Sequence, residues 1–368
     1  MSEIHQRTFS RRSFLGGIAV IGGAGLLTRA GHGLRPQGGE HRIARKAVPM
    51  TIAFSFLPNV EYAGWILAQQ NGWYRDYDLD ITLVGGGPNA PTPEAQLTAG
   101  TAQVATEANT VRLFSALAQG QPLVIFAQDY QQSPNGLLSL RRRPVTTPAE
   151  LEGARIIASA PNAPSIAALM KINHVKNYTF VPGGITVDGL LAGQGDALLA
   201  FAYNQPLTLE LHYGMREGKD FFFTPFSKLN YDILSDVSIT TRSYRDHHRE
   251  ALVKLVAANI RGWTEDIKFP LNGTNATMRE FGASQGLNRA QQEKANKIQA
   301  SYVVSRWSQA HGLLSLNPGY IQDSVYRTLR ASGITNLPAL EHVIDTSIVA
   351  DAWKLVGKAN RGVRGRGR

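Results

Sequence analysis

The sequence predicts an α/β fold of two lobes, each built on a mostly parallel sheet with helices on both faces. Strand and helix patterns alternate from residue 51 to residue 224. The alternation restarts near Leu137, after the turn-forming pair Asn135-Gly136. A mostly helical segment follows a last strand near Ser238. Repeated strand–helix units favour parallel sheets covered by helices, and the restart favours two such lobes.

The first lobe is predicted from strand–helix units with clear helix starts. Thr92-Pro93 opens a short helix, because Thr is a good N-cap and Pro is favoured in the first turn. Asn109 or Thr110 is expected to cap the next helix. The expected strands are 51–56, 79–84, 102–106 and 123–127, and the expected helices are 62–70, 93–99 and 111–119.

The second lobe repeats this pattern. Thr147 and Glu150 form a predicted capping box with Pro148 between them. Thr186 and Asn204 are the predicted caps of two further helices. The expected strands are 137–140, 155–158, 178–181, 198–202 and 221–224, and the expected helices are 165–174, 187–192 and 205–211.

After a return strand at 238–241, the sequence is mostly helical. Its clearest helix has apolar residues at three- and four-residue steps, which places them on one face. These residues are Leu252, Leu255, Val256, Ile260, Trp263 and Ile267. Further helices are expected at 277–281, 289–304, 318–332 and 346–356. This long segment predicts that the chain returns to the first lobe after a second crossing.

The composition excludes several classes of protein. The 368 residues include no Cys, which excludes disulfides, Cys-ligated zinc, iron–sulfur clusters and thiol nucleophiles. With 43% hydrophobic and 18% charged residues, a mainly disordered chain is also excluded. The formal net charge is +10, but much of the excess Arg lies at the two ends of the chain. We therefore expect no nucleic-acid partner.

Residues 1–30 are predicted to be an export signal. Arg11-Arg12 is followed by Phe14-Leu15 and by an apolar, Gly-rich run to Leu27. The paired arginines resemble a twin-arginine signal, so the twin-arginine translocase is an expected partner during export. An uncleaved N-terminal anchor is the alternative. Residues 31–48 are expected to be a linker, and the Arg- and Gly-rich residues 361–368 a basic disordered tail.

No motif for nucleotide binding, for a serine hydrolase or for a zinc protease is present. His247-His248 is the one pair of adjacent histidines. Adjacent positions on a helix point about 100° apart, so these two rings cannot readily hold one metal ion. We expect no catalytic residue, no metal and no cofactor.

A ligand site is expected where strands end and helices begin, because parallel sheets bind ligands beyond the carboxyl ends of their strands. Aromatic, amide and carboxylate side chains gather at these corners, and this mixture suits a small polar heterocycle. The predicted ligand-binding residues are Asn59, Glu61, Tyr62, Gly87, Asn89, Glu107, Asn109, Asp129, Tyr130, Ser159, Asn162, Tyr203, Asn204 and Asp232.

Each type of candidate residue has a structural alternative. The asparagines at 59, 109, 162 and 204 would serve equally as helix caps. Tyr62, Tyr130 and Tyr203 would equally be core or rim aromatics. Gly87 lies in a segment that would form an ordinary turn, and Glu61 and Glu107 would suit the first turn of a helix.

Four segments of the sequence resemble periplasmic solute-binding proteins for thiamine-pyrimidine precursors, sulfonates and nitrate. They are 58–64 (PNVEYAG) with 68–74 (AQQNGWY), 97–105 (LTAGTAQVA), 148–156 (PAELEGARI) and 190–197 (LLAGQGDA). They occur in the family's order and spacing, over about residues 50–265. Tyr62 stands where the pyrimidine-precursor branch has His.

The resemblance implies the two-lobe type II periplasmic binding protein fold, with two crossing strands as the hinge. Lobe 1 would comprise residues 49–130 and 237–360, and lobe 2 residues 131–236. It further implies a periplasmic or secreted protein that captures a small polar molecule in the cleft and delivers it to an ABC permease and its ATPase. The ligand would be a thiamine-pyrimidine precursor or similar heterocycle, or a sulfonate- or nitrate-type anion.

Two other functions are compatible with the same fold. One is an enzyme acting on a pyrimidine or sulfinate substrate, although the related pyrimidine-building enzyme uses an active-site His and a Cys-rich motif that this chain lacks. The other is a sensor that uses the cleft to regulate a partner. The transport interpretation requires no covalent chemistry.

Overall fold

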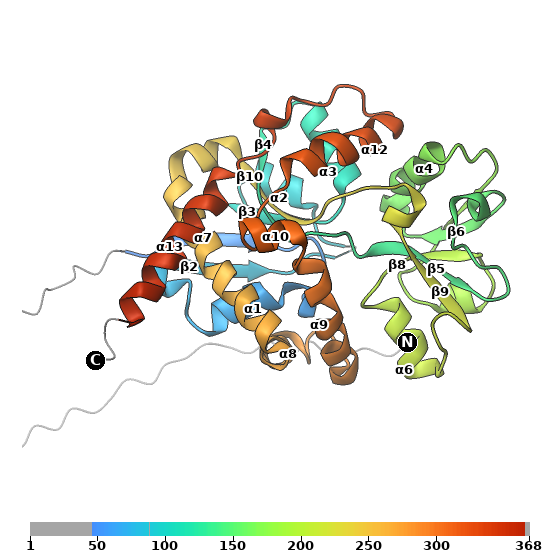
Figure 1. Ribbon diagram of the computed structural model, residues 1–368, viewed down its shortest axis with the longest axis horizontal. Helices are drawn as coiled ribbons and strands as arrows, with labels where there is room; N and C mark the ends of the chain where they lie inside the picture. The colour runs from blue at the N-terminus through green and yellow to red at the C-terminus, as the bar shows by residue number, and fades with distance from the viewer. Residues whose placement is uncertain (1–45, 88, 365–368) are drawn as a thin grey trace, which may run out of the picture. The chain divides into compact units, whose positions relative to one another are not determined.

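The computed structural model describes residues 46–87 and 89–364. Its first sheet has five strands in the order β2-β1-β3-β10-β4, of which only β10 is antiparallel to its neighbours. The strands are β1 (Val48–Ala53), β2 (Leu79–Val84), β3 (Val104–Glu107), β4 (Leu123–Tyr130) and β10 (Ser235–Thr241). Figure 1 shows most of this sheet on the left.

The second sheet repeats this topology in the order β7-β6-β8-β5-β9, with β5 as the antiparallel strand. Its strands are β5 (Asn135–Leu140), β6 (Arg155–Ala158), β7 (Thr179–Pro182), β8 (Ala197–Phe201) and β9 (Phe221–Pro225). The chain therefore crosses between β4 and β5 and returns between β9 and β10. In each sheet the strand that follows a crossing is the antiparallel one. The predicted pair of mostly parallel sheets is confirmed.

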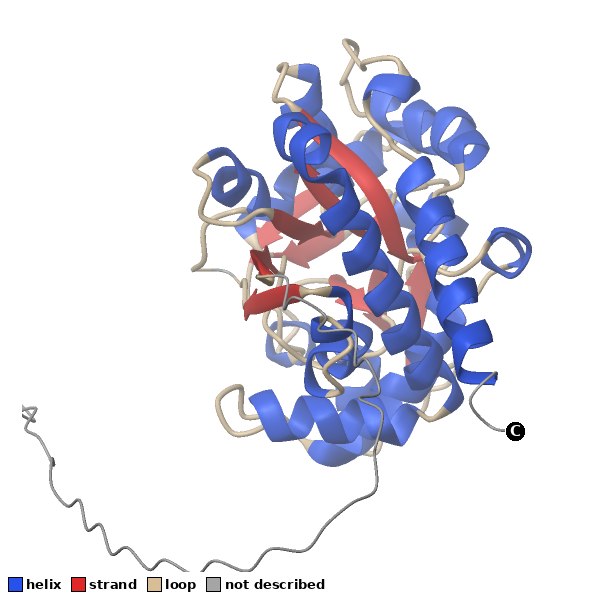
Figure 2. Ribbon diagram, turned by 90° about the vertical axis from the view of Figure 1, so that its left-hand side faces the viewer, coloured by secondary structure: helices blue, strands red, loops and turns tan. Residues whose placement is uncertain are grey.

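Helices pack on the faces of both sheets, as Figures 1 and 2 show. The helices between strands are α1 (Ala63–Gln70), α2 (Pro93–Thr98), α3 (Thr110–Ala118), α4 (Ala163–Ile172), α5 (Asp188–Leu191) and α6 (Gln205–Tyr213). Those after β10 are α7 (Arg242–Lys268), α8 (Pro270–Phe281), α9 (Arg289–Val303), α10 (Arg306–His311), α11 (Pro318–Tyr320), α12 (Tyr326–Ala331) and α13 (Ser347–Arg364). A single 3-10 turn, η1 (Val60–Tyr62), precedes α1.

The long helix α7 packs against α1 through two glycines. A side chain at Gly262 would overlap the backbone carbonyl of Gly64, so the two helices approach at backbone distance. The predicted apolar face of α7 is buried from Leu252 to Trp263, while Ile267 is half-buried. This close packing fixes α1, and with it η1 and the loop that follows β1.

Several caps agree with the sequence prediction and two differ. Thr92 and Asn109 each accept a hydrogen bond from the first turn of α2 and α3. Thr186 is not a cap, because α5 begins at Asp188 and the Thr186 hydroxyl donates to the Asp188 carboxylate instead. Asn204 precedes α6, but its side chain accepts from Gln291 of α9 rather than from the helix.

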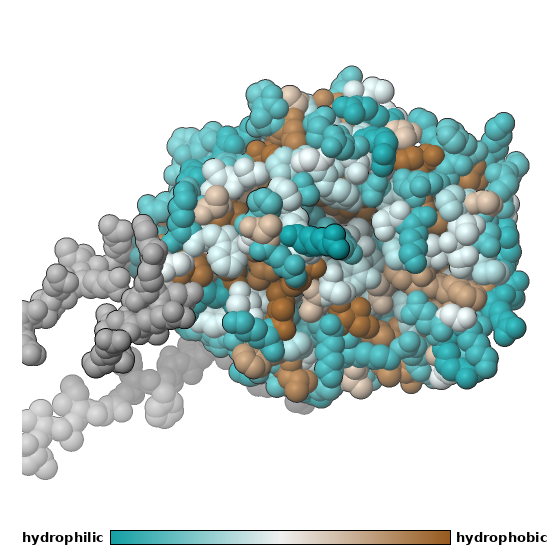
Figure 3. Space-filling view, viewed as in Figure 1, coloured by the Kyte–Doolittle hydropathy of each residue, from teal (hydrophilic) through white to brown (hydrophobic). Residues whose placement is uncertain are grey.

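The predicted export signal and most of the predicted linker lie outside the described residues. At the other end, α13 includes the first four residues of the segment predicted as a tail, and 365–368 again lie outside. Within the described residues, no helix combines the length and apolar character needed to span a membrane. The face drawn in Figure 3 is largely hydrophilic, with hydrophobic residues in small separate groups.

Candidate functional site

A cavity of about 280 Å³ is lined by residues of both sheets. We call it the first chamber. The first sheet contributes the loop after β1, with Ser55 and Phe56, and the β3–α3 corner. The second sheet contributes the start of β5, the β6–α4 corner and the end of β8. The residues used below are Ser55, Phe56, Glu61, Glu107, Asn109, Arg112, Asn135, Ser159, Asn162, Phe201 and Gln205.

A second cavity of about 310 Å³ adjoins the first and shares four lining residues with it: Phe56, Glu61, Ile185 and Phe201. We call it the second chamber. Its remaining lining is rich in amides, from Asn59 after β1, Asn204 before α6 and Gln291 on α9. The rings of Phe56 and Phe201 lie 6.4 Å apart at 28°, so an aromatic pair from the two sheets stands between the chambers.

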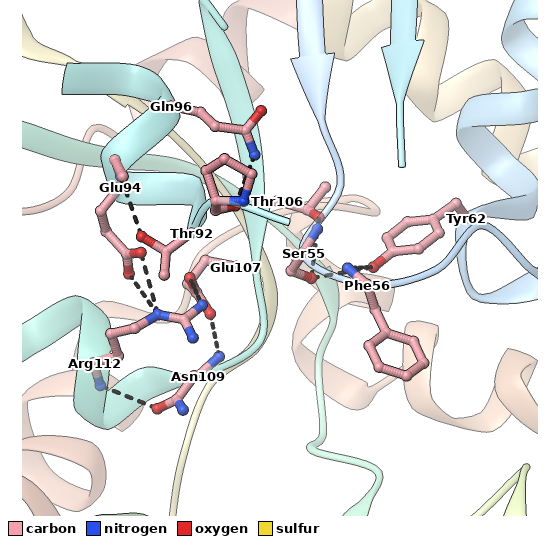
Figure 4. A network of polar contacts seen from close by, with 12 residues as sticks. Ser55, Phe56, Tyr62, Thr92, Glu94, Gln96, Thr106, Glu107, Asn109 and Arg112 are labelled. Atoms are coloured by element: carbon pink, nitrogen blue, oxygen red, sulfur yellow. Dashed lines mark hydrogen bonds and ion pairs between the residues drawn. The ribbon is translucent and has the colours of Figure 1, made fainter. Parts of the chain in front are cut away.

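The loop after β1 is held by buried hydroxyls. Ser55 donates its backbone N–H to the Thr106 hydroxyl at 2.9 Å, and Phe56 donates its own to the Tyr62 hydroxyl at 3.0 Å. Tyr62 also stacks on Phe54, with ring centroids 4.0 Å apart. Figure 4 shows the hydrogen bonds of Ser55 and Phe56 with Thr106 and Tyr62. Tyr62 therefore positions Phe56 at the chamber wall, and is not itself among the lining residues.

The β3–α3 corner is an ion-pair triad. Arg112 lies 3.2 Å from Glu94 and 2.5 Å from Glu107, and the Asn109 N–H donates to the other Glu107 oxygen. Figure 4 shows Arg112 between the two carboxylates. Burial, reinforced by the charge of Glu94, raises the pKa of Glu107 to about 8, although Arg112 and the Asn109 N–H act in the opposite direction. The guanidinium is therefore already partnered.

Two further carboxyls meet at the wall shared by the chambers, where Glu61 lines both and Asp236 lies behind it. Glu61 of η1 and Asp236 of β10 are 4% and 1% exposed, and their side chains are hydrogen-bonded to each other. Burial raises the pKa of Glu61 to about 7. Burial and the charge of Glu61 raise the pKa of Asp236 well above its ordinary value. Asp236 has a φ of 46°, a left-handed conformation that is costly for a residue other than Gly.

The structure brings nine of the predicted residues to the chambers. Glu61 lines both. Gly87, Glu107, Asn109, Ser159 and Asn162 line the first chamber, and Asn59, Tyr203 and Asn204 line the second. Asn59 and Asn109 are also helix caps, so the cap and the cavity wall are the same residues there.

Five predicted residues are not among those that line the chambers. They are Tyr62, Asn89, Asp129, Tyr130 and Asp232. Asp129 is buried behind the site, where it accepts from the Trp65 indole at 2.6 Å. Tyr130 is buried and donates to Gln299 at 2.8 Å. Asp232 pairs with Arg327 at 3.1 Å, and Asn89 is exposed.

Sequence reasoning missed Phe56, Arg112, Asn135, Phe201 and Gln205 as lining residues. Asn135 was interpreted as a turn residue, but it is the first residue of β5. The sequence signal that could have identified Asn135 as a lining residue is a polar residue at the start of an otherwise apolar strand. Phe201 is the last residue of β8, so it lies at the edge of the sheet where the predicted strand-end residues also lie. Arg112 lies in the first turn of α3, where an acidic residue is more usual.

Comparison with known proteins supports this description. A family model described as NMT1/THI5 like matches residues 59–272, which is more than half of the chain. A search of curated proteins gives no match.

Solved structures match over most of the chain at low identity. One is the ligand-binding component of an ABC-type import system from Staphylococcus aureus with zinc bound (12% identity, 83% of this chain and 99% of that one, TM-score 0.60). Another is the alkanesulfonate-binding protein from Xanthomonas axonopodis pv. citri bound to MOPS (16%, 83% and 98%, 0.55). A third is the desulfurization enzyme DSZB (14%, 83% and 99%, 0.51). At these identities the likeness establishes the two-lobe fold.

Proposed function

Because the chain belongs to the NMT1/THI5-like family, we propose that it is the exported substrate-binding protein of an ABC importer. It would capture a small polar molecule between its two lobes and deliver it to a membrane permease and its ATPase. The observation that carries this proposal is the first chamber, since residues of both sheets line one cavity. A ligand held by both lobes favours the closed state by its differential affinity for that state.

We assign lobe 1 to residues 49–130 and 237–360 and lobe 2 to residues 131–236. The sheet topology supports this division, because β1–β4 and β10 form one sheet and β5–β9 the other. The two crossings between the sheets would act as the hinge. On the side of the second chamber, α6 and α9 approach through the ion pair of Glu210 and Lys294.

The proposed ligand is a thiamine-pyrimidine precursor or a similar nitrogen heterocycle. Phe56 and Phe201 line both chambers, where aromatic rings can stack on a planar molecule, and the amides of the second chamber can both donate and accept hydrogen bonds. A sulfonate- or nitrate-type anion is the alternative, and the structural neighbour bound to MOPS motivates it.

A ligand screen tests the proposal. The panel contains aminopyrimidines, alkanesulfonates, taurine and nitrate, and thermal unfolding is the readout. A ligand at about 100 times its dissociation constant should stabilise the protein by about 2.7 kcal/mol. Phe201→Ala should abolish the shift, whereas Leu211→Ala, an exposed residue that lines neither chamber, should retain it. No shift with any member of the panel would contradict the proposal.

The same samples test the enzyme alternative, an activity on a pyrimidine or sulfinate substrate. Mass spectrometry of each ligand after incubation should return it unchanged if the protein only binds it. Conversion of a ligand to product would replace the transport proposal with catalysis.

Export by the twin-arginine route to the periplasm or beyond is the remaining part of the proposal. A reporter fused to residues 1–30 should be exported, and replacing Arg11 and Arg12 together with Lys should block it. Export of the double variant through another translocase would contradict the twin-arginine route.

A further inference from the structure

The walls of the two chambers are acidic. Glu61 and Glu107 line them, and Arg112 is the only Arg or Lys among the described residues that do so. Arg112 is already bonded to Glu94 and Glu107, so two carboxylates face one guanidinium. A sulfonate or nitrate would have to compete with these carboxylates for the one cation present.

Glu61 and Asp236 form a buried acid pair, and no cation among the described residues acts on either carboxyl. The groups that act on the two carboxyls are Asn59, Tyr62, Ser235 and each other. The other titratable groups nearby, which respond to their charge, are Asp129 and Tyr130 of β4 and Tyr203 after β8. None of these is a cation, and His212 of α6 is the other titratable group that lines the second chamber with Glu61 and Tyr203. Two carboxylates this close in a buried site cannot both stay ionised, so the pair holds at least one proton.

Two buried oxygens near the first chamber have no hydrogen-bond partner among the described residues. Asp236 Oδ1 accepts no hydrogen bond from the described residues, and neither does Oδ1 of Asn135, which lines the first chamber and is 9% exposed. Both atoms are acceptors. A proton on the acid pair accounts for the Asp236 oxygen, because buried polar atoms are nearly always satisfied.

Among the described residues, no group of three or more His, Asp or Glu side chains is arranged to hold a metal ion. Beside Glu61, in contrast, Phe56 and Phe201 present aromatic rings to both chambers. Aromatic faces attract cations, most strongly where water is excluded.

We propose that the cleft selects a planar organic cation rich in N–H groups, such as an amidinium or a protonated aminoheterocycle. Its N–H groups donate to Glu61, and its positive charge takes the place of a proton on that carboxyl, while Asp236 keeps its own. That proton passes to the solvent. The inference rests on the proposed binding function and specifies the charge of the ligand.

Proton release makes the affinity depend on pH. Below about pH 7 Glu61 is itself protonated and the cation must displace that proton, because burial raises the pKa of Glu61 to about 7. Affinity for a cation should therefore increase as the pH rises through about 7. A neutral ligand displaces no proton, so its affinity should not change over the same range.

Three probes of one shape separate the charge states: benzamidine, benzamide and benzoate. Isothermal titration calorimetry at about pH 6, 7 and 8, in buffers of different ionisation enthalpy, gives both the affinity and the number of protons released. We expect benzamidine to bind at least about tenfold more tightly than benzamide, because charge-assisted hydrogen bonds are about twice as strong as neutral ones. Benzoate should not bind, and benzamidine should release a proton near pH 6.

Glu61→Gln tests the residue itself, because it keeps the shape and removes the charge. The variant should lose the preference for benzamidine over benzamide and the pH dependence. Glu280→Gln, at an exposed position of α8, is the matched control and should keep both. The proton count of the wild type decides the question even if Glu61→Gln fails to fold.

The outcomes separate this inference from the proposed function. If benzoate or an alkanesulfonate binds as tightly as benzamidine, or if benzamidine binds with no proton release, the inference is wrong and a binding function stands. If neither these probes nor the panel above bind, both are wrong.

Discussion

Asp129 should make the stability of the protein fall as the pH rises. The residue is the last but one of β4, next to the first crossing, and is 1% exposed. Its Oδ2 accepts from the Trp65 indole at 2.6 Å, while its Oδ1 has no partner among the described residues. Burial therefore raises the pKa of Asp129 to about 8, although the Trp65 hydrogen bond favours the charged form.

The sign follows from the protons bound in each state. Between about pH 4 and about pH 8 the folded protein keeps a proton on Asp129 that the unfolded chain has released. The free energy of unfolding then falls by about 1.4 kcal/mol per pH unit. Relaxation of the buried site reduces the total, and we expect a loss of roughly 2–4 kcal/mol across the window.

Asp129→Asn removes this loss while keeping an oxygen that can accept from Trp65. Urea denaturation at about pH 5.5 and about pH 8 measures the free energy of unfolding of each protein. The difference between variant and wild type should shift in favour of the variant by about 2 kcal/mol or more at the higher pH. Asp80→Asn, at an exposed position of β2, should show no such shift. A pH dependence unchanged by Asp129→Asn would refute a buried, protonated Asp129.

Three further changes test the packing and the triad. Gly262→Ala should destabilise the protein by about 3 kcal/mol or more, because its methyl group would overlap the Gly64 carbonyl; urea denaturation measures it. Gly357→Ala, in open space on α13, should instead stabilise by about 0.5–1 kcal/mol. Arg112→Met should destabilise more at about pH 9 than at about pH 6, since Glu107, with its pKa raised to about 8, is protonated at the lower pH. Equal losses at both pH values would contradict this role of the ion pair.

The order of the elements could be predicted because local signals mark where they begin and end. Thr92 before Pro93 and Asn109 before Thr110 cap the helices that the sequence indicated. The restart at Asn135-Gly136 coincides with the start of the second sheet. Thr186 failed as a cap because its hydroxyl has a nearer partner, the Asp188 carboxylate, and a sequence pattern does not weigh such local competition.

The sequence predicts which strand–helix junctions form the candidate site, but not which of their side chains line it. Strand ends show which corners face the cleft, but not which way each side chain points. Glu61 and Tyr62 are neighbours in η1, and one lines both chambers while the other is buried against Phe54. Asp129 and Tyr130 lie at the end of β4, as predicted, but their side chains point into the core, where they contact α1 and α9.

Asp236 shows why part of the site depends on contacts that no local pattern contains. It lies 175 positions after Glu61 in the chain, and β10 reaches Glu61 only because it inserts between β3 and β4. A positive φ and a buried acceptor without a partner are both unfavourable, and each lowers stability. Such costs concentrate where structure serves binding rather than stability, since Gly would avoid the strain of the positive φ and an apolar side chain would avoid the unpaired acceptor. The acid pair is therefore better explained as part of a recognition site than as part of the core.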